Sequence, residues 1–393
     1  MAAITGLRGT GQFNTDFRPT NYRELFTLME PNGTAPLQAL LSMASSESTD
    51  DPKFNHFRDE LPDRKLSVNG AVASTSTASI VVDASDDEGF VVAGAILVNV
   101  ETGEMMRATA DANPSTHTLT VERNIGGTSH QIADNANLII AGFASSEGGS
   151  SPTAISFDPT TDYNFTQIFK TSVSVSGTLQ NTFLRTGDKE QEQLTKALKL
   201  HMSDIERAFF FGRRHEANAA TSAPTRYTGG LTSMIPNVTD GASYGASANV
   251  ITEKEFDRLL IEDIFAYGSA EKVAFCGPRV ISNMMEIGKN RWQPTQIDNA
   301  YGVSLSRYTT YAGDLLVMMH PMFRQVPGMA EEMIVLDMAE LKYRHMQGRD
   351  TSLIRNIEAP DFDGVKHMYQ TEAGLEMTQA KVHHRIKGWS AVS

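Results

Sequence analysis

The chain has 393 residues, and its 34 Lys and Arg against 47 Asp and Glu give a formal net charge of −13. This length suggests about two to three domains. The 40% of hydrophobic residues is enough for a sizeable core, so disorder of the whole chain is excluded. An acidic chain lacks the broad basic surface that phosphate binding needs. A protein dedicated to binding DNA or RNA is therefore a poor fit to this sequence.

Cysteine usage excludes two further classes. The single cysteine, Cys276, can form neither a disulfide framework nor a cysteine-based zinc site. It ends the apolar run 272–276 directly before a Gly-Pro pair, which is typical of a buried strand end with an inert thiol.

No targeting segment is visible in the sequence. Residues 1–11 lack the apolar stretch of about 7–15 residues that a signal peptide needs. The longest apolar run, 90–100, is shorter than the about 20 residues of a membrane-spanning helix. We therefore expect a protein that is made and used in the cytoplasm.

Residues 1–65 do not have the pattern of a compact domain. Short helices are predicted over 21–29 and 36–45, and 45–52 is a turn-rich spacer. Because an arm of this kind cannot bury its apolar residues on itself, we expect a neighbouring subunit to hold it.

Residues 66–143 change to short β-rich runs separated by Gly, Asn, Asp and Pro, which predicts a small antiparallel barrel or sandwich. Nine acidic residues against two basic ones give this block a net charge of −7, so we expect it to face water. A Ser/Gly-rich linker at 145–151 follows it. The expected strands are 78–83, 90–100, 105–110, 118–123 and 137–141.

The strongest helical pattern in the chain follows an extended segment at 165–176. Thr186 or Asp188 is expected to cap this helix, and if it ends at Phe211 it is about 40 Å long, which suits a structural strut. Truncating Leu198 is expected to leave a cavity, because this residue belongs to an apolar stripe with helical spacing. The stripe consists of Leu194, Ala197, Leu198, His201, Ile205, Ala208 and Phe209.

The remainder mixes helices and strands. Thr252 and Glu255 form a predicted capping box, and Asp363 with Gly364 predicts a hairpin turn. Alternation at 380–387 predicts a half-buried strand with His384 inside and His383 in solvent. The expected helices are 252–267 and 278–288, and the expected strands are 273–275, two within 301–320, 333–337, 341–347, 352–358, 365–369 and 375–387.

Motifs that could support catalysis lack the context that the chemistry needs. Residues 241–245 match G-x-S-x-G, but a nucleophile elbow needs an apolar strand before the serine, and Ser243 lies in a polar loop. Adjacent residues on a strand point to opposite faces, so His383 and His384 cannot share a metal ion. Asp361 and Asp363 resemble half a calcium loop without its closing Glu. His201 is interpreted as a core or interface histidine. We therefore expect no catalytic, cofactor-binding or metal-ligating residues and no cofactor.

The order of segments carries more information than any motif. Five of them match features of one architecture: a returning strand of an extended loop at 162–169, a spine helix at 186–213, a Gly-Leu turn at 228–231, an axial-domain sheet with its exit at 301–321, and a closing peripheral strand at 372–388. In this order the chain resembles the major capsid proteins of tailed bacteriophages, whose shell fold also occurs in encapsulins and in the floor of herpesvirus capsids. The block at 66–143 departs from the minimal fold and resembles the β insertion of a podovirus-like branch.

The resemblance implies an α+β fold with an N-terminal arm, an extended loop, a long spine helix, peripheral and axial domains, and an inserted small all-β domain. The implied boundaries are 1–65 for the arm and the start of the loop, 66–145 for the inserted domain, 146–184 for the loop return, 185–250 for the spine helix and the start of the peripheral domain, 251–330 for a peripheral helix and the axial domain, and 331–393 for the β return.

The resemblance also implies a function. Many copies would close into an icosahedral shell of hexamers and pentamers around double-stranded DNA, held without sequence-specific binding, in a virion assembled in the bacterial cytoplasm. Implied partners are a separate scaffolding protein, a portal and decoration proteins, and no membrane. We expect that no N-terminal scaffolding segment is removed on maturation and that the acidic β block lies outside the shell, away from DNA.

Two other classes stay open at this point. An accessory virion protein of decoration or tail-tube type would also tolerate a β insertion, and the number of copies per particle separates it from a shell subunit. A serine hydrolase using Ser243 would be labelled by a fluorophosphonate probe.

Overall fold

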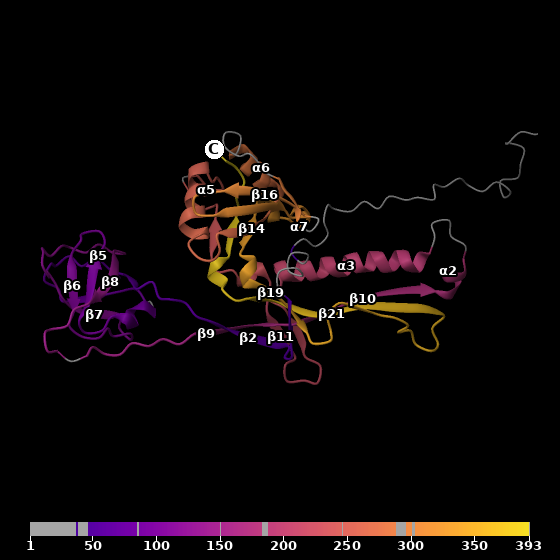
Figure 1. Cartoon of the computed structure of the whole chain (residues 1–393), viewed down its shortest axis with the longest axis horizontal. Coiled ribbons are helices and arrows are strands. Elements are labelled where there is room, and N and C mark those ends of the chain that lie inside the picture. The colour runs from indigo at the N-terminus through magenta and orange to yellow at the C-terminus, as the bar shows by residue number, and fades with distance from the viewer. Residues whose placement is uncertain are drawn as a thin grey trace, which may run out of the picture. The chain divides into compact units, whose positions relative to one another are not determined.

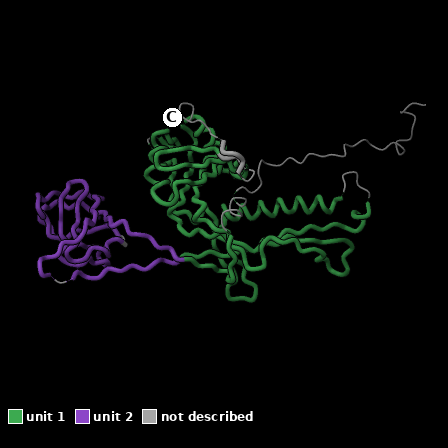
Figure 2. The backbone as a smooth tube through the Cα atoms, in the orientation of Figure 1, with its two compact units in different colours: residues 1–56, 162–393 green, residues 57–161 purple. Residues whose placement is uncertain are grey.

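The computed structural model describes residues 37, 46–84, 86–149, 151–182, 188–245, 247–287, 296–300 and 303–392. The helix expected at 21–29, and all of 36–45 except Leu37, lie outside these residues. The chain divides into two compact units, which Figure 2 colours separately: unit 1, residues 1–56 and 162–393, and unit 2, residues 57–161. Each unit has its own buried cluster of apolar side chains, as an independent domain requires.

Unit 2 is a small antiparallel sheet with strand order β3-β8-β5-β6-β7-β4. Its two end strands also meet, because the Asn69 amide donates to the Val81 carbonyl and the Asp83 amide to the Ser67 carbonyl, both at 2.9 Å. The sheet therefore closes into a barrel, which leaves no long free edge for unwanted pairing. The strands are β3 (Lys65–Ser67), β4 (Ser79–Val81), β5 (Ala95–Asn99), β6 (Met105–Ala108), β7 (Thr118–Glu122) and β8 (Asn137–Phe143).

A buried ion pair joins the loops of this barrel. Arg123 donates from Nε and Nη2 to the two carboxylate oxygens of Glu104, at 2.9 and 2.6 Å, and both side chains are almost completely buried. Arg123 also donates to the carbonyl of Ser74 at 3.0 Å, and the His130 amide donates to Glu104 at 2.9 Å. Burial alone would raise the pKa of Glu104, but these donors together hold it below its ordinary value.

Unit 1 contains a long helix that lies along a two-stranded ribbon (Figure 1). The helix α3 (Lys189–Phe211) is capped by Asp188, one of the two residues predicted for this role, whose carboxylate accepts the Glu190 amide at 2.9 Å. The ribbon consists of β10 (Gln167–Ser176) and β21 (Gly364–Met377), which pair antiparallel over the whole of β10.

The buried face of α3 differs from the predicted stripe near its C-terminal end. Leu194, Ala197, His201, Ile205 and Phe209 are buried as predicted, whereas Leu198 and Ala208 are only partly buried. Glu206 and Phe210 are buried instead, because the last turns of α3 enter a core shared with a second sheet. Leu198 is therefore a poorer test of this interface than Ile205.

The ribbon continues into a wider sheet of order β1-β19-β21-β10, and β20 (Ser352–Ile354) also pairs with β21. The segment expected to be a spacer contains β1 (Ser46–Thr49), which pairs in parallel with β19 (Leu341–Met346). Glu47 fixes this strand through ion pairs with Lys342 and Arg344. The expectation of a turn-rich spacer was wrong.

The expected hairpin near 363–364 is present, because the consecutive strands β20 and β21 pair antiparallel, but its loop is longer than a two-residue turn and ends before Gly364. Gly364 opens the continuous strand β21 and pairs with Ser176, and a Cβ at Gly364 would lie 2.3 Å from the Val175 carbonyl oxygen. Glycine is present here because another strand approaches closely, which a hairpin pattern cannot distinguish from a turn.

The second sheet of unit 1 has seven strands in the order β13-β22-β18-β14-β17-β16-β15. Alternate residues of its central strands enter two different cores, so Phe275 packs with α3 while Cys276 packs with the helices on the other side. Burial on both faces explains the continuous apolar runs in the sequence. The strands are β13 (Val238–Asp240), β14 (Glu271–Cys276), β15 (Gln296–Ala300), β16 (Val303–Thr309), β17 (Asp314–Met319), β18 (Met333–Leu336) and β22 (His384–Lys387).

Helices cover this sheet as the capping signals predicted. Thr252 and Glu255 form the capping box of α5 (Glu253–Leu259), which continues as a π-helical turn over Leu260–Ile264. The second predicted helix is α6 (Pro278–Ile287). The shorter elements of unit 1 are α2 (Gly177–Asn181), β11 (His215–Ala217), β12 (Thr225–Tyr227), α4 (Leu231–Met234) and α7 (Pro321–Gln325). Strands β2 (Lys53–Arg58) and β9 (Thr160–Phe165) pair with each other where the chain passes between the units.

The last strand is shorter than the alternation predicted. Ala380–Val382 forms a 3-10 turn, and the strand begins at His384. His383 is therefore fully buried rather than in solvent, because it leaves the turn towards the interior.

Candidate assembly surfaces

The residues flagged as chemically suggestive do not form a reactive site among the described residues. Ser243 is exposed in the turn after β13, and its hydroxyl donates to the Asp240 carbonyl at 3.3 Å. No described histidine hydrogen-bonds that hydroxyl, and no group of three or more described His, Cys, Asp or Glu residues could hold a metal ion. Burial raises the pKa of the Cys276 thiol, which keeps it unreactive.

The histidines serve as internal hydrogen-bond partners. His201 is fully buried between Thr171 on β10, at 2.9 Å, and Thr371 on β21, at 2.8 Å, so it ties α3 to both strands. Burial lowers its pKa, which favours the neutral ring. His383 accepts the Asp337 amide at 3.1 Å, just after β18, whereas His384 meets the hydroxyl of Thr239 on β13 at 2.7 Å, so the two rings have different partners.

Three segments that carry the sequence resemblance meet at Asn164. Its Oδ1 accepts the Gly229 amide at 2.7 Å, and its Nδ2 donates to the carbonyls of Gly229 at 3.1 Å and Leu375 at 2.7 Å. Asn164 is fully buried, so these bonds satisfy backbone groups that water cannot reach. The asparagine thus joins β9, the turn after β12, and β21.

The adjacent turn is closely packed against the end of α3. A Cβ at Gly230 would lie 2.7 Å from the Ala208 carbonyl oxygen and 2.7 Å from the Gly212 nitrogen. Only glycine fits at this distance, which explains the glycine in the Gly-Leu turn.

The side chain of Tyr163 fixes the base of the β2–β9 ribbon. Lys53 lies 4.2 Å and Arg214 4.5 Å from the centre of its ring, and Arg214 also pairs with Asp162 at 2.6 Å. These contacts link β2 and β9 to Arg214, which follows the C-terminal end of α3.

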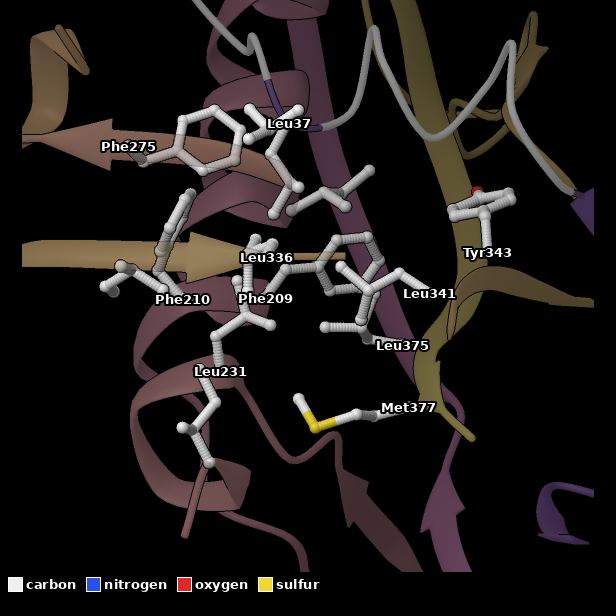
Figure 3. Close-up of a cluster of buried hydrophobic side chains, with 14 of the residues drawn as sticks. Leu37, Phe209, Phe210, Leu231, Phe275, Leu336, Leu341, Tyr343, Leu375 and Met377 are labelled. Atoms are coloured by element: carbon white, nitrogen blue, oxygen red, sulfur yellow. The ribbon is translucent and has the colours of Figure 1, made fainter. Parts of the chain in front are cut away.

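A second fixed point lies inside unit 1, where α3 meets the seven-stranded sheet. The Glu206 carboxylate accepts His320 Nε2 at 2.9 Å and the backbone amide of Leu37 at 2.8 Å. All three residues are fully buried, and Leu37 belongs to the same apolar cluster as Phe209 and Phe275 (Figure 3). We had expected a neighbouring subunit to hold the N-terminal segment, but Leu37 is held by its own subunit.

Large apolar side chains are exposed where the chain passes from unit 1 to unit 2. Phe57 on β2 is 75% exposed, and Leu61 beyond it is 87% exposed. Among the strands that the structure describes, β2 pairs with β9 alone, and a two-stranded ribbon has too little burial to be stable by itself. These side chains are candidates for contact with another molecule.

The face of β10 that points away from α3 is also open. Thr171 bonds to α3, so the alternate residues lie on the other face, where Ile168 is 50% exposed. Cross-strand pairing places Met368 of β21 and Ile354 of β20 on this same face. The result is a partly apolar sheet surface three strands wide.

None of the described helices is both long and apolar enough to cross a membrane.

Sequence reasoning missed Glu206 and Asn164, because a single polar residue in a helix or strand gives no sign that it is buried. Asn164 directly precedes the extended segment 165–176, but an Asn-Phe pair does not identify partners that lie far away in the sequence.

Comparison with known proteins shows the family. The family model described as SU10 major capsid protein matches residues 8–390. The major capsid protein of Pseudomonas phage PaMx41 is 26% identical over 365 residues, which cover 87% of this chain and 84% of that protein.

Two solved structures contain chains that are similar to this one. The capsid of the native GTA particle has a TM-score of 0.45 and 11% identity, covering 98% of this chain and 99% of that one. The SrpI encapsulin complex from Synechococcus elongatus has a TM-score of 0.42 and 13% identity, covering 59% of this chain and 76% of that one. Because the family model spans nearly the whole chain, this protein belongs to the SU10 major capsid protein family and is a structural subunit of a phage capsid shell.

Proposed function

We propose that many copies of this chain close into an icosahedral shell of hexamers and pentamers around double-stranded DNA, and that the chain has no catalytic role. The exposure of Phe57 and Leu61 supports this proposal best. Burying large apolar side chains against a neighbour stabilises the assembled form by about 25 cal/mol for each square ångström removed from water.

A neighbouring copy is the partner that we propose for these side chains. The open face that carries Ile168, Ile354 and Met368 offers apolar surface of matching character. If the ribbon of each copy contacts the open face of the next copy, the contact is heterologous, and such contacts form a ring when the rotation between copies closes.

We also propose that unit 2 lies on the outside of the shell. Its residues, 57–161, include 14 acidic and 5 basic side chains, so this unit carries −9 of the total charge of −13. Enclosed DNA is a dense polyanion and would repel such a module at short range. The acidic balance also argues for DNA that is enclosed without sequence-specific contacts.

Further partners follow from the same function. We infer that a separate scaffolding protein, a portal and decoration proteins act with this chain, and that assembly takes place in the cytoplasm of the bacterial host. Each of these is checked by identifying the proteins that copurify with assembled particles.

The test of the shell contact is to express the full chain and count closed particles by electron microscopy. A Phe57→Ser, Leu61→Ser double variant should remain soluble but form at least about tenfold fewer particles, because hot-spot side chains dominate interfaces. The control is Val100→Ser, since Val100 is 58% exposed in the same unit. Normal particle yield from the double variant would overturn the proposed contact, and absence of particles from the unmodified chain would overturn the shell function.

A further inference from the structure

The hairpin formed by β11 and β12 is positively charged in an acidic chain. Residues 213–227 contain three arginines, one glutamate and no aspartate, so this segment carries +2 while the whole chain carries −13. Within the described residues, β11 and β12 pair only with each other, and the loop between them extends away from the other elements of unit 1 (Figure 1). A protruding positive segment is well placed to meet a negatively charged partner.

The charges of this hairpin are divided between its two faces. On one face the cations already have carboxylate partners. Arg226 binds Glu216, its cross-strand neighbour, at 2.8 Å, and Arg214 binds Asp162 at 2.6 Å. Because cross-strand partners and alternate residues share a face, the only acidic residue of the segment lies on this neutralised face.

The opposite face has an unpaired cation beside two aromatic rings. Tyr227 is 43% exposed, and its ring stacks on that of His215, with the ring centres 6.1 Å apart. Arg213 lies two residues before His215, so the alternation of β11 places it on the same side. Its side chain is exposed and forms no ion pair or hydrogen bond with any described residue. This basic face, which consists of Arg213, His215, Ala217, Thr225 and Tyr227, contains no carboxylate.

The groups on the basic face suit a phosphodiester backbone. An unpaired guanidinium donates charge-assisted hydrogen bonds to phosphate oxygens, and a tyrosine hydroxyl also donates to them. Contacts of this kind do not depend on the base sequence, which agrees with DNA that is enclosed without sequence-specific binding.

We propose that the basic face is the surface through which each subunit contacts the phosphate backbone of the enclosed DNA. The inference rests on the proposed shell function, because it names the surface that meets the DNA inside the shell. One arginine per subunit binds weakly. Many copies act on one DNA molecule, however, so the contacts add up over the shell.

A crosslink tests whether this face meets DNA. Because Cys276 is buried, a Ser222→Cys variant carries one accessible thiol, in the exposed loop of the hairpin. The thiol is labelled with a photoactivated crosslinker, and DNA-filled particles that contain the labelled chain are illuminated. The control is Ser115→Cys, which places the thiol in an exposed turn of unit 2. We expect at least about tenfold more DNA crosslinks from position 222, because phosphate contacts act only within about 10 Å.

Each outcome of the crosslink decides between partners. Crosslinks from position 222 to another protein chain would show that the basic face binds carboxylates of a neighbour, and they would overturn the proposal. A DNA yield no higher than that of the control would overturn it as well. If the unmodified chain forms no DNA-filled particles, the shell function fails instead.

Changes of charge on the same face test the phosphate contact itself. The readout is the temperature at which filled particles release their DNA, detected with an intercalating dye. Arg213→Ser should lower this temperature and Thr225→Arg should raise it, because they remove or add one cation per subunit. The control is Arg258→Ser, since the Arg258 side chain is 68% exposed but already paired with Glu262. Equal release temperatures in all variants, or the same shifts in the melting of empty particles, would overturn the phosphate contact.

Discussion

The side chain of Asn164 exchanges two hydrogen bonds with the backbone of Gly229, accepting its amide at 2.7 Å and donating to its carbonyl at 3.1 Å. The side-chain amide therefore supplies the turn after β12 with the pair of backbone hydrogen bonds that a neighbouring strand would otherwise make. It connects the turn after β12 to β21, because the same nitrogen donates to the Leu375 carbonyl at 2.7 Å.

We expect Asn164→Asp to lower the free energy of unfolding of the subunit by about 2–5 kcal/mol. The carboxylate keeps the acceptor but loses the donor, so two buried carbonyls lose their partner and a charge is buried. Denaturant unfolding of soluble subunit measures the change. Asn218→Asp at an exposed turn is the matched control, and an equal effect in both variants would contradict the role of Asn164.

Truncation along α3 should follow burial rather than the apolar pattern. Ile205→Ala removes a fully buried side chain and should lower the free energy of unfolding by about 2–5 kcal/mol. Leu198→Ala should cost less, because Leu198 is only partly buried. Leu200→Ala at an exposed position should stay within about 0.5 kcal/mol. Thermal unfolding of the three variants gives the order, and a larger loss at Leu198 than at Ile205 would refute this placement of the helix.

The subunit should lose stability as the pH falls below 6.5. Burial lowers the pKa of His383 from 6.5 to about 3 and that of His384 to about 4. Below pH 6.5 the unfolded chain binds protons that the folded chain does not, so each histidine removes up to about 1.4 kcal/mol per pH unit until its folded pKa is reached. Protonation of His383 is further opposed because its Nδ1 accepts the Asp337 amide.

Unfolding free energies measured between pH 7 and pH 5 test this expectation. A His383→Gln, His384→Gln double variant should show a flatter dependence on pH, whatever its stability at pH 7. An unchanged slope would show that other groups are responsible.

Arg123→Ala should loosen unit 2 and leave unit 1 intact. It leaves Glu104 buried without its partner, which should cost about 3–5 kcal/mol. Hydrogen exchange should increase within 57–161 and stay unchanged in α3, because the units have separate cores. Glu122→Gln at an exposed position of β7 is the control. Increased exchange throughout the chain would argue against two independent units.

The sequence predicted elements whose signals are local. The cap at Asp188, the capping box at Thr252 and the short strands of unit 2 depend on neighbouring residues and turn chemistry, and the structure has them. The parallel strand β1 and the buried Glu206 were missed because their partners are distant. His320 and Leu37 lie 114 and 169 residues from Glu206, and no local pattern indicates such pairing.

The closed barrel of unit 2 has a consequence for how such shells can be altered. The chain enters and leaves it through neighbouring strands, with the Thr160 hydroxyl bonded to the Arg58 carbonyl at 3.2 Å. The strands of the barrel pair with one another and need no strand from unit 1. Unit 2 is therefore laid out as a module that can be exchanged for another domain. A different folded domain whose ends lie one strand spacing apart could be grafted at the same two strands to display a foreign sequence.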